Sequence, residues 1–172
     1  MDFPNYYTSA RRVLTLVERL REGNRRNSKD QKTGQSYDYL YPSPAGHRWQ
    51  SFLDSCFHAI VMAHVDSEAA VSELRTLARG QEANGFIGHV SFWGGRLWGD
   101  LPSRLKHPFA WRSGHSALMH PPLLAQAVER VTEISGDPWV AAEFLPVLDM
   151  YHQWLFRYRS AEDGLLVIFS PL

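Results

Sequence analysis

Two helices of this chain follow one another almost without a connection, and that spacing restricts the fold more than any other feature. The apolar stretch over residues 50–64 predicts a largely buried helix. Asp66 is placed to cap a second helix, with Glu68 favourable in its first turn and Gly80 near its end. Helices joined by one or two residues fold back on each other, so the pattern predicts an antiparallel hairpin.

The same pattern recurs towards the C-terminus. A helix over residues 122–135 ends at Gly136, and Asp137-Pro138 is a cap followed by proline at the first helical position. The next helix runs to about residue 160, and Pro146 is expected to kink or split it. A second helical hairpin is therefore predicted.

The remaining segments comprise one more helix and two long connections. Residues 6–23 carry an amphipathic stripe, whereas residues 24–48 are polar and turn-rich and predict a long loop. Residues 81–120 are irregular, aromatic and rich in glycine. The stripe of the first helix consists of Val13, Leu16, Val17 and Leu20. The predicted class is all-α, with helical hairpins whose long loops gather at one end, where sites tend to lie.

Composition excludes several classes of function. The 172 residues suit one domain, and the hydrophobic content of 44% is that of a globular chain. The formal net charge is zero, which argues against nucleic acid or an anionic membrane as the main partner. No apolar run reaches transmembrane length and no signal core is present, so the cytoplasm is the expected location. Cys56, the single cysteine, lies in an apolar stretch and is expected to be a buried, inert thiol.

The eight histidines do not form a metal signature. His58 and His64 are six residues apart, which does not place them on one helical face. His107, His115 and His120 lie on an irregular stretch without cysteine or carboxylate partners at ligand spacing. We therefore expect no metal site and no cofactor.

Three blocks of the sequence resemble a known family. They read YPSPAGHRWQSFLDSCFHAIVMAHVDSEAAVSELRTLARGQEANGFIGHVSFW, HPPLLAQAVERV and FLPVLDMYHQWLFRYRSAEDGLLVIFSP. In order and spacing they resemble the start of the catalytic domain of six-hairpin glycosidases, in particular mannosylglycerate hydrolase-like proteins akin to glycoside hydrolase family 63. The resemblance covers roughly residues 37–171.

The resemblance implies an (α/α)6 toroid that hydrolyses α-linked sugars, such as glycosylglycerates or oligosaccharides, with inversion. Such chemistry uses a general acid and a general base roughly 6.5–9.5 Å apart. Twelve helices and their connections need at least about 200 residues, and this chain supplies about five helices. We therefore expect residues 1–172 to form a single partial domain, incomplete at its C-terminus, with a leading helix (1–23), a loop (24–48) and hairpins with aromatic loops (49–172).

The resemblance also implies which residues contact sugar. In relatives the aspartate at the position of Asp54 faces the cleft, although a role at the helix N-terminus is the alternative for this residue. The aromatic residues after the first hairpin shape the cleft in relatives, although plain packing would also explain them. Relatives carry tryptophan where this chain has Ser51 and Leu53, which removes stacking surface. The expected substrate-binding residues are Gln50, Asp54, His89, Phe92, Trp93 and His120.

No catalytic residue is expected within this chain, because the resemblance implies that the general acid lies beyond Leu172. The first hypothesis is thus a glycosidase-family fragment or half-domain that is inactive alone, with a small carbohydrate as the substrate of its full-length relatives. The alternative is a non-catalytic sugar-binding or assembly module that completes a toroid with a partner chain supplying the remaining hairpins. A third possibility, a terpenoid-cyclase-like toroid, lacks support because no Asp-rich metal motif is present.

Overall fold

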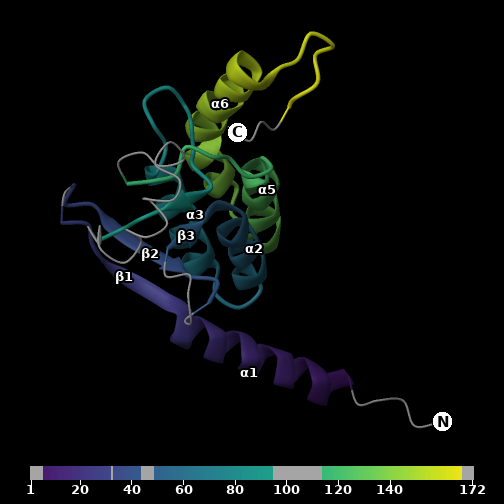
Figure 1. Cartoon of the computed structure of the whole chain (residues 1–172). Coiled ribbons are helices and arrows are strands. Elements are labelled where there is room, and N and C mark those ends of the chain that lie inside the picture. Colours follow the sequence, from purple (N-terminus) through teal and green to yellow (C-terminus); the bar gives the residue numbers. More distant parts are fainter. Residues whose placement is uncertain (1–5, 32, 44–48, 95–113, 168–172) are drawn as a thin grey trace.

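The computed structural model describes residues 6–31, 33–43, 49–94 and 114–167. Its helices and strands are arranged as a helical body with a β-hairpin at one side (Figure 1). In chain order they are α1 (Tyr6–Asn24), β1 (Arg25–Lys29), β2 (Ser36–Leu40), β3 (Gln50–Ser51), α2 (Phe52–Ala63), α3 (Ser67–Arg79), β4 (Val90–Ser91), α5 (Leu124–Ser135) and α6 (Pro138–Arg159). The mostly helical architecture, with only small sheets, confirms the predicted class and is that of a partial helical toroid.

The first predicted hairpin is formed by α2 and α3. The Asp66 carboxylate accepts a hydrogen bond from the backbone N–H of Ala69 at 2.9 Å, and Gly80 is the residue at which α3 ends. The helix boundaries lie within two residues of those expected. The cap therefore starts α3 immediately after α2 and turns the chain back on itself.

The second hairpin, α5 and α6, also forms as predicted. Gly136 ends α5 with a φ of 70°, a left-handed conformation that glycine adopts without a steric cost. Asp137 then accepts a hydrogen bond from the Trp139 N–H at 3.0 Å. Pro146 was expected to kink or split the last helix, and the split does not occur, because α6 is continuous across it. Proline leaves the carbonyl four residues earlier without a donor. That residue, Ala142, is exposed like Pro146 itself, so water can bind the carbonyl.

The core lies between the two hairpins. Side chains from α2, α3, α5 and α6 form one hydrophobic cluster with Phe86 and Ile87 from the connection after α3. Its most deeply buried members include Phe52, Leu74, Leu77, Leu124, Phe144, Tyr151 and Leu155. Cys56 belongs to this cluster, and desolvation raises the pKa of its thiol to about 12. The prediction that Cys56 is buried is therefore confirmed, and the raised pKa agrees with the expectation of an inert thiol.

The expectation of a loop over residues 24–48 is wrong for residues 25–29 and 36–40. Strands β1 and β2 pair antiparallel from Arg25 opposite Leu40 to Lys29 opposite Ser36. Tyr37 and Tyr39 are buried while their neighbours in β2 are more exposed, so the strand has the alternation of a half-buried sheet. The alternation spans only five residues between turn-forming residues, which is why a loop was expected there.

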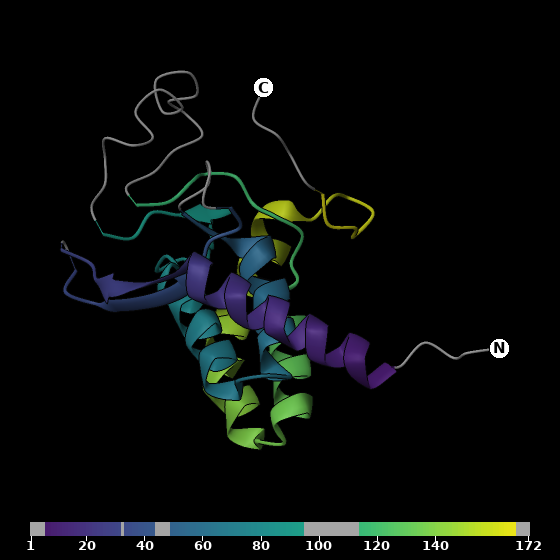
Figure 2. The same ribbon diagram turned by 90° about the horizontal axis from the view of Figure 1, so that it is seen from below.

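Helix α1 forms where it was predicted, but its apolar stripe is only partly covered. Val17 packs against the core, whereas Val13, Leu16 and Leu20 are exposed. Arg21 near the end of α1 pairs with Asp66 at 2.7 Å and fixes this end to the start of α3. Viewed from below, α1 crosses in front of the hairpin helices while its N-terminal end points away from them (Figure 2). No helix within the described ranges is long and apolar enough to cross a membrane.

Leu74→Ala tests the position of the core. Leu74 is fully buried between the hairpins, so its truncation is expected to lower the free energy of unfolding by about 2–5 kcal/mol. Leu145→Ala on the exposed side of α6 is the matched control and should change it by about 0.5 kcal/mol or less. Urea denaturation followed by circular dichroism measures both, and equal effects would contradict the assigned core.

Candidate functional site

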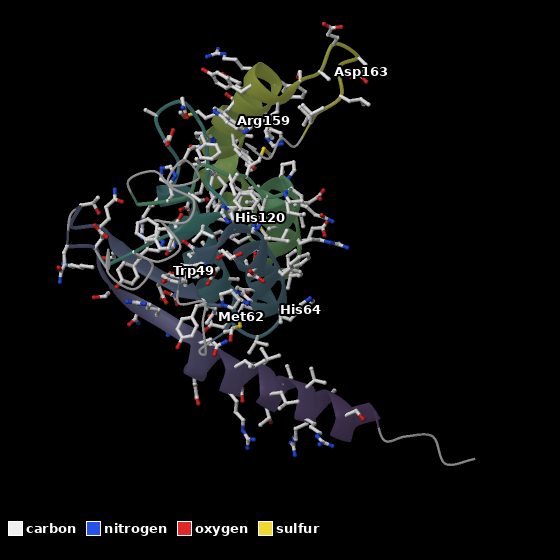
Figure 3. All side chains as sticks on the ribbon, viewed as in Figure 1. Trp49, Met62, His64, His120, Arg159 and Asp163 are labelled. Carbon is white, nitrogen blue, oxygen red and sulfur yellow. The ribbon has the colours of Figure 1, made fainter. Side chains whose placement is uncertain are left out.

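The residues expected to bind substrate gather around the N-terminal end of α2. Gln50 lies in β3 directly before α2, and Asp54 lies in the first turn of the helix. The pairing of β3 with β4 places Gln50 opposite Ser91 and brings the segment around β4 to the same end. His120 comes from the connection before α5 and lies at the centre of Figure 3. The chain therefore assembles three separate segments at one helix end.

His120 serves as the missing cap of α2. Ser51, at the cap position, makes no side-chain hydrogen bond to the helix, and the His120 Nδ1 atom instead accepts one from the Leu53 N–H at 3.2 Å. Desolvation lowers the pKa of His120, although the charge of Asp54 opposes this shift. The neutral ring that results must carry its proton on Nε2, because Nδ1 accepts. Nε2–H is thus the donor that His120 can offer to a ligand.

His89 supports His120 from the side. The two imidazoles meet edge to face with ring centroids 5.1 Å apart. The Nδ1 atom of His89 shares a hydrogen bond with the hydroxyl of Ser116, which is fully buried. Desolvation, reinforced by the neighbouring His120, lowers the pKa of His89 to about 4. The site therefore holds two neutral imidazoles at neutral pH.

Asp54 is the carboxylate at this end of α2. Its side chain is half-buried and no residue of the described ranges donates a hydrogen bond to it. Its charge raises the pKa of both His58 and His120 against the effect of burial. A carboxylate in the first helical turn is stabilised by the helix dipole. It remains able to accept hydrogen bonds from hydroxyl groups.

The aromatic part of the site is built around Trp93. Its indole N–H donates to the Gln50 side-chain carbonyl at 2.7 Å, and its ring stacks on Tyr37 with centroids 6.0 Å apart and planes inclined by 27°. Phe92 meets Trp49 edge to face at 5.9 Å. Gln50 itself is fully buried, and its amide nitrogen lies 3.4 Å from the Glu73 backbone carbonyl. The buried Gln50 side chain thereby fixes the orientation of the Trp93 indole.

Glu73 is a residue that sequence reasoning missed. It is only 3% exposed, and its carboxyl group accepts hydrogen bonds from the Leu40 N–H at 2.6 Å and from the Ser55 hydroxyl. Desolvation raises the pKa of Glu73 to about 8 in spite of these donors. The sequence did contain a signal, because Glu73 lies on the apolar face of its helix between Ala70 and Leu77.

His58 is a titratable group beside Glu73. Its Nδ1 atom lies 4.0 Å from the Glu73 carboxylate, and burial lowers the pKa of the imidazole. At neutral pH the ring is therefore uncharged and the contact is not an ion pair. The described residues contain no group of three or more His, Cys, Asp or Glu side chains placed to hold a metal ion. His107 lies outside the described ranges.

Comparison with known proteins relates the whole arrangement to one family. The model of the mannosylglycerate hydrolase MGH1-like glycoside hydrolase domain matches residues 47–172, which is more than half of the chain. The solved structure of GH63 mannosylglycerate hydrolase from Thermus thermophilus in complex with Tris and D-glycerate is similar to the chain, with 25% sequence identity and a TM-score of 0.67. The match covers 90% of this chain and 35% of that one.

A second solved structure gives the same result. It is described as an uncharacterized conserved protein from Thermus thermophilus, and it is similar at 26% identity and a TM-score of 0.60, over 86% of this chain and 34% of the other. Comparison with curated proteins gives no match. The chain thus spans about a third of the length of the solved structures that it matches.

The buried carboxyl group of Glu73 gives a prediction for stability against pH. Its pKa is raised from an ordinary 4.5 to about 8, so the folded state retains a proton that the unfolded state releases between these values. The contribution of Glu73 to the free energy of unfolding should therefore fall as the pH rises from about 4.5 to about 8, by up to about 1.4 kcal/mol per pH unit. The histidines with lowered pKa values contribute a slope of the opposite sign at acidic pH, so the comparison with a Glu73 variant isolates the contribution of Glu73. Glu73→Gln, which is always neutral, should remove this slope.

Urea denaturation at a series of pH values measures the difference between the variant and the wild type. The matched control is Glu133→Gln, because Glu133 is exposed and pairs with Arg130 on the surface of α5. Parallel pH profiles for wild type and Glu73→Gln would show that Glu73 is already ionised in the folded protein.

Proposed function

The chain belongs to the family of mannosylglycerate hydrolase MGH1-like glycoside hydrolase domains, and from this premise we propose that the N-terminal end of α2 forms one wall of a sugar-binding cleft. The observation that carries the proposal is the convergence of Asp54, His120 and Trp93 from three segments on this helix end. The expected ligand is an α-linked sugar of the glycosylglycerate or oligosaccharide type.

The chemistry of these side chains suits a carbohydrate. Sugar hydroxyls both donate and accept hydrogen bonds, and Asp54 offers an acceptor while His120 offers the Nε2–H donor. The apolar face of a sugar ring packs on aromatic rings, which Phe92 and Trp93 supply beside them. Gln50 contributes to this wall indirectly, since its side chain holds the Trp93 indole.

Cleavage requires more than this wall. Inverting hydrolysis uses two carboxyl groups on opposite sides of the glycosidic bond. Within the described residues, Asp54 is the half-buried carboxylate at the site, and Glu73 is enclosed among Leu40, Ser55 and Gln50. We therefore propose that these residues bind the sugar, and that the acid and base of hydrolysis come from parts of the protein outside the described ranges.

Binding to the purified chain tests the proposal. Titration with mannosylglycerate, glucosylglycerate and methyl α-mannoside by isothermal calorimetry is expected to show binding without release of free sugar. Asp54→Asn removes the charge that strengthens the hydrogen bonds and should weaken binding about tenfold. Asp149→Asn is the control, because Asp149 is exposed on α6 and bonded to Gln153.

Two results would contradict this proposal. Absence of binding to all three glycosides would show that the N-terminal end of α2 is not a sugar-binding site in this chain. Steady release of mannose or glucose would show that the chain carries its own pair of catalytic carboxyl groups. Equal weakening by Asp54→Asn and Asp149→Asn would show that the effect of Asp54 is not local.

A second candidate function is an assembly module whose apolar faces are covered by hairpins of a partner chain. The observation that favours it is the exposure of large apolar side chains on the two outer helices, including Leu20 on α1 at 62% and Trp139 on α6 at 74%. Faces of this kind are typical of interfaces. The match to about a third of longer relatives also agrees with a partial domain.

Solution behaviour distinguishes this candidate. Without a partner, the exposed faces should cause concentration-dependent self-association in sedimentation velocity experiments. Leu20→Lys on the apolar stripe of α1 should shift the protein towards the monomer, whereas Thr15→Lys, which adds the same charge on the opposite face, should not. A wild-type chain that stays monomeric and melts cooperatively would contradict the need for a covering partner.

A further inference from the structure

The β1–β2 hairpin is fastened to α3 along one side. Asp38 exchanges two hydrogen bonds with the Thr76 hydroxyl, which accepts from the Asp38 N–H and donates to its carbonyl, both at 2.9 Å. The Leu40 N–H donates to Glu73, and the Arg79 side chain donates to the Ser36 carbonyl. The hairpin is thereby held in one register against a buried helix face.

The other side of the same hairpin reaches the loop that carries Trp93. The Tyr37 ring stacks on the Trp93 indole. The Asp30 carboxylate, 7% exposed at the hairpin turn, accepts a hydrogen bond from the Gly94 N–H at 3.0 Å. Trp93 is thus held by Gln50 from the helical body and by Tyr37 from the hairpin, and Asp30 holds the backbone of the residue that follows it.

Gly94 shows how closely the hairpin fits this loop. Its φ is +82°, and a Cβ atom at this position would lie 2.8 Å from the Tyr37 hydroxyl oxygen. Any side chain here would have to displace the tyrosine or the loop. Gly164, in the turn after α6, has a similar φ of +81° but nothing within 4 Å of its Cβ position. The two glycines therefore share the backbone requirement and differ in the contact with Tyr37.

From this geometry we propose that the β1–β2 hairpin is a positioning element of the sugar site, in which Tyr37 and Asp30 set the plane and height of the Trp93 ring for stacking on a sugar. The inference rests on the proposed function for its ligand, an α-linked sugar with an apolar face. Tyr37 itself is buried and acts through Trp93, so it is a positioning residue. Glu73 and Thr76 secure the hairpin to α3, which keeps the wall rigid.

The experiment follows the Trp93 indole N–H directly. In a ¹⁵N-correlated spectrum of the full chain, Trp93→Phe identifies that signal among those of the six tryptophans. Tyr37→Leu and Gly94→Ala are expected to displace or broaden the Trp93 signal and to weaken binding of methyl α-mannoside about 3- to 10-fold, the value of one aromatic contact. Tyr37→Phe keeps the ring and should restore both the signal and the affinity.

Matched controls separate positioning from general damage. Tyr41→Leu makes the same change next to the hairpin, where Tyr41 bonds to the Gly23 carbonyl and not to the Trp93 loop. Gly164→Ala imposes the same backbone strain as Gly94→Ala without the contact, in a turn whose backbone bonds to Ala161 and not to the Trp93 loop. Both controls should leave the Trp93 signal in place. If Tyr37→Leu does not fold, the pair Gly94→Ala and Gly164→Ala carries the test alone.

The outcomes distinguish this inference from the proposed function. An unchanged Trp93 signal and unchanged affinity in Tyr37→Leu or Gly94→Ala would overturn the positioning role while leaving sugar binding intact. A displaced Trp93 signal in a chain whose wild type binds no glycoside would support the contact between hairpin and Trp93 and overturn the sugar site. A displaced signal with weakened binding, restored by Tyr37→Phe, supports both.

Discussion

The hydrogen bonds of the buried Glu73 carboxyl group join the parts of this structure that the hydrophobic core alone would leave independent. One oxygen accepts from the backbone of β2 at Leu40, and the other accepts from Ser55 on α2. The backbone carbonyl of the same residue accepts from Gln50, which in turn holds Trp93. A buried polar group that lacked these partners would cost several kcal/mol, so hairpin, helix and loop are constrained to the arrangement that provides them.

This constraint explains why the candidate site lies where it does. Apolar packing between the two helical hairpins specifies which faces meet, but it tolerates small shifts along the helices. Directional bonds do not, and they fix β2 on α3, β3 beside β4 and His120 at the start of α2. The result is a rigid helix end carrying a carboxylate, a neutral imidazole and an oriented indole. Rigid presentation of such groups is what a carbohydrate site requires, because each sugar contact is weak by itself.

The elements that could be predicted from the sequence share a local cause. Asp66, Gly136 and the Asp137-Pro138 pair act within a few residues, so both helical hairpins and their boundaries followed from the pattern. The last helix was expected to kink or split at Pro146, yet it continues to Arg159 because the affected turn lies at the exposed surface. The β1–β2 hairpin was missed, since its stability comes from Thr76 and Glu73 more than thirty residues away. The candidate site residues were named through the family resemblance. The position of Glu73 on an apolar helix face was a signal that went unused, whereas no local pattern indicated that Tyr37 supports Trp93.

The sequence by itself determined the helical class, the two helical hairpins, the buried cysteine and the relationship to a glycoside hydrolase domain. Helix caps, apolar periodicity and the order of motifs all depend on residues that are close together in the chain, so they can be recognised without the tertiary structure. Only the tertiary structure decided that the buried Gln50 is hydrogen-bonded to Trp93, that His120 caps α2 and that Tyr37 of the β1–β2 hairpin stacks on Trp93. These contacts join residues 43 to 67 positions apart, and in a chain such pairs are specified by packing and by the need to satisfy buried polar groups, which no local pattern records.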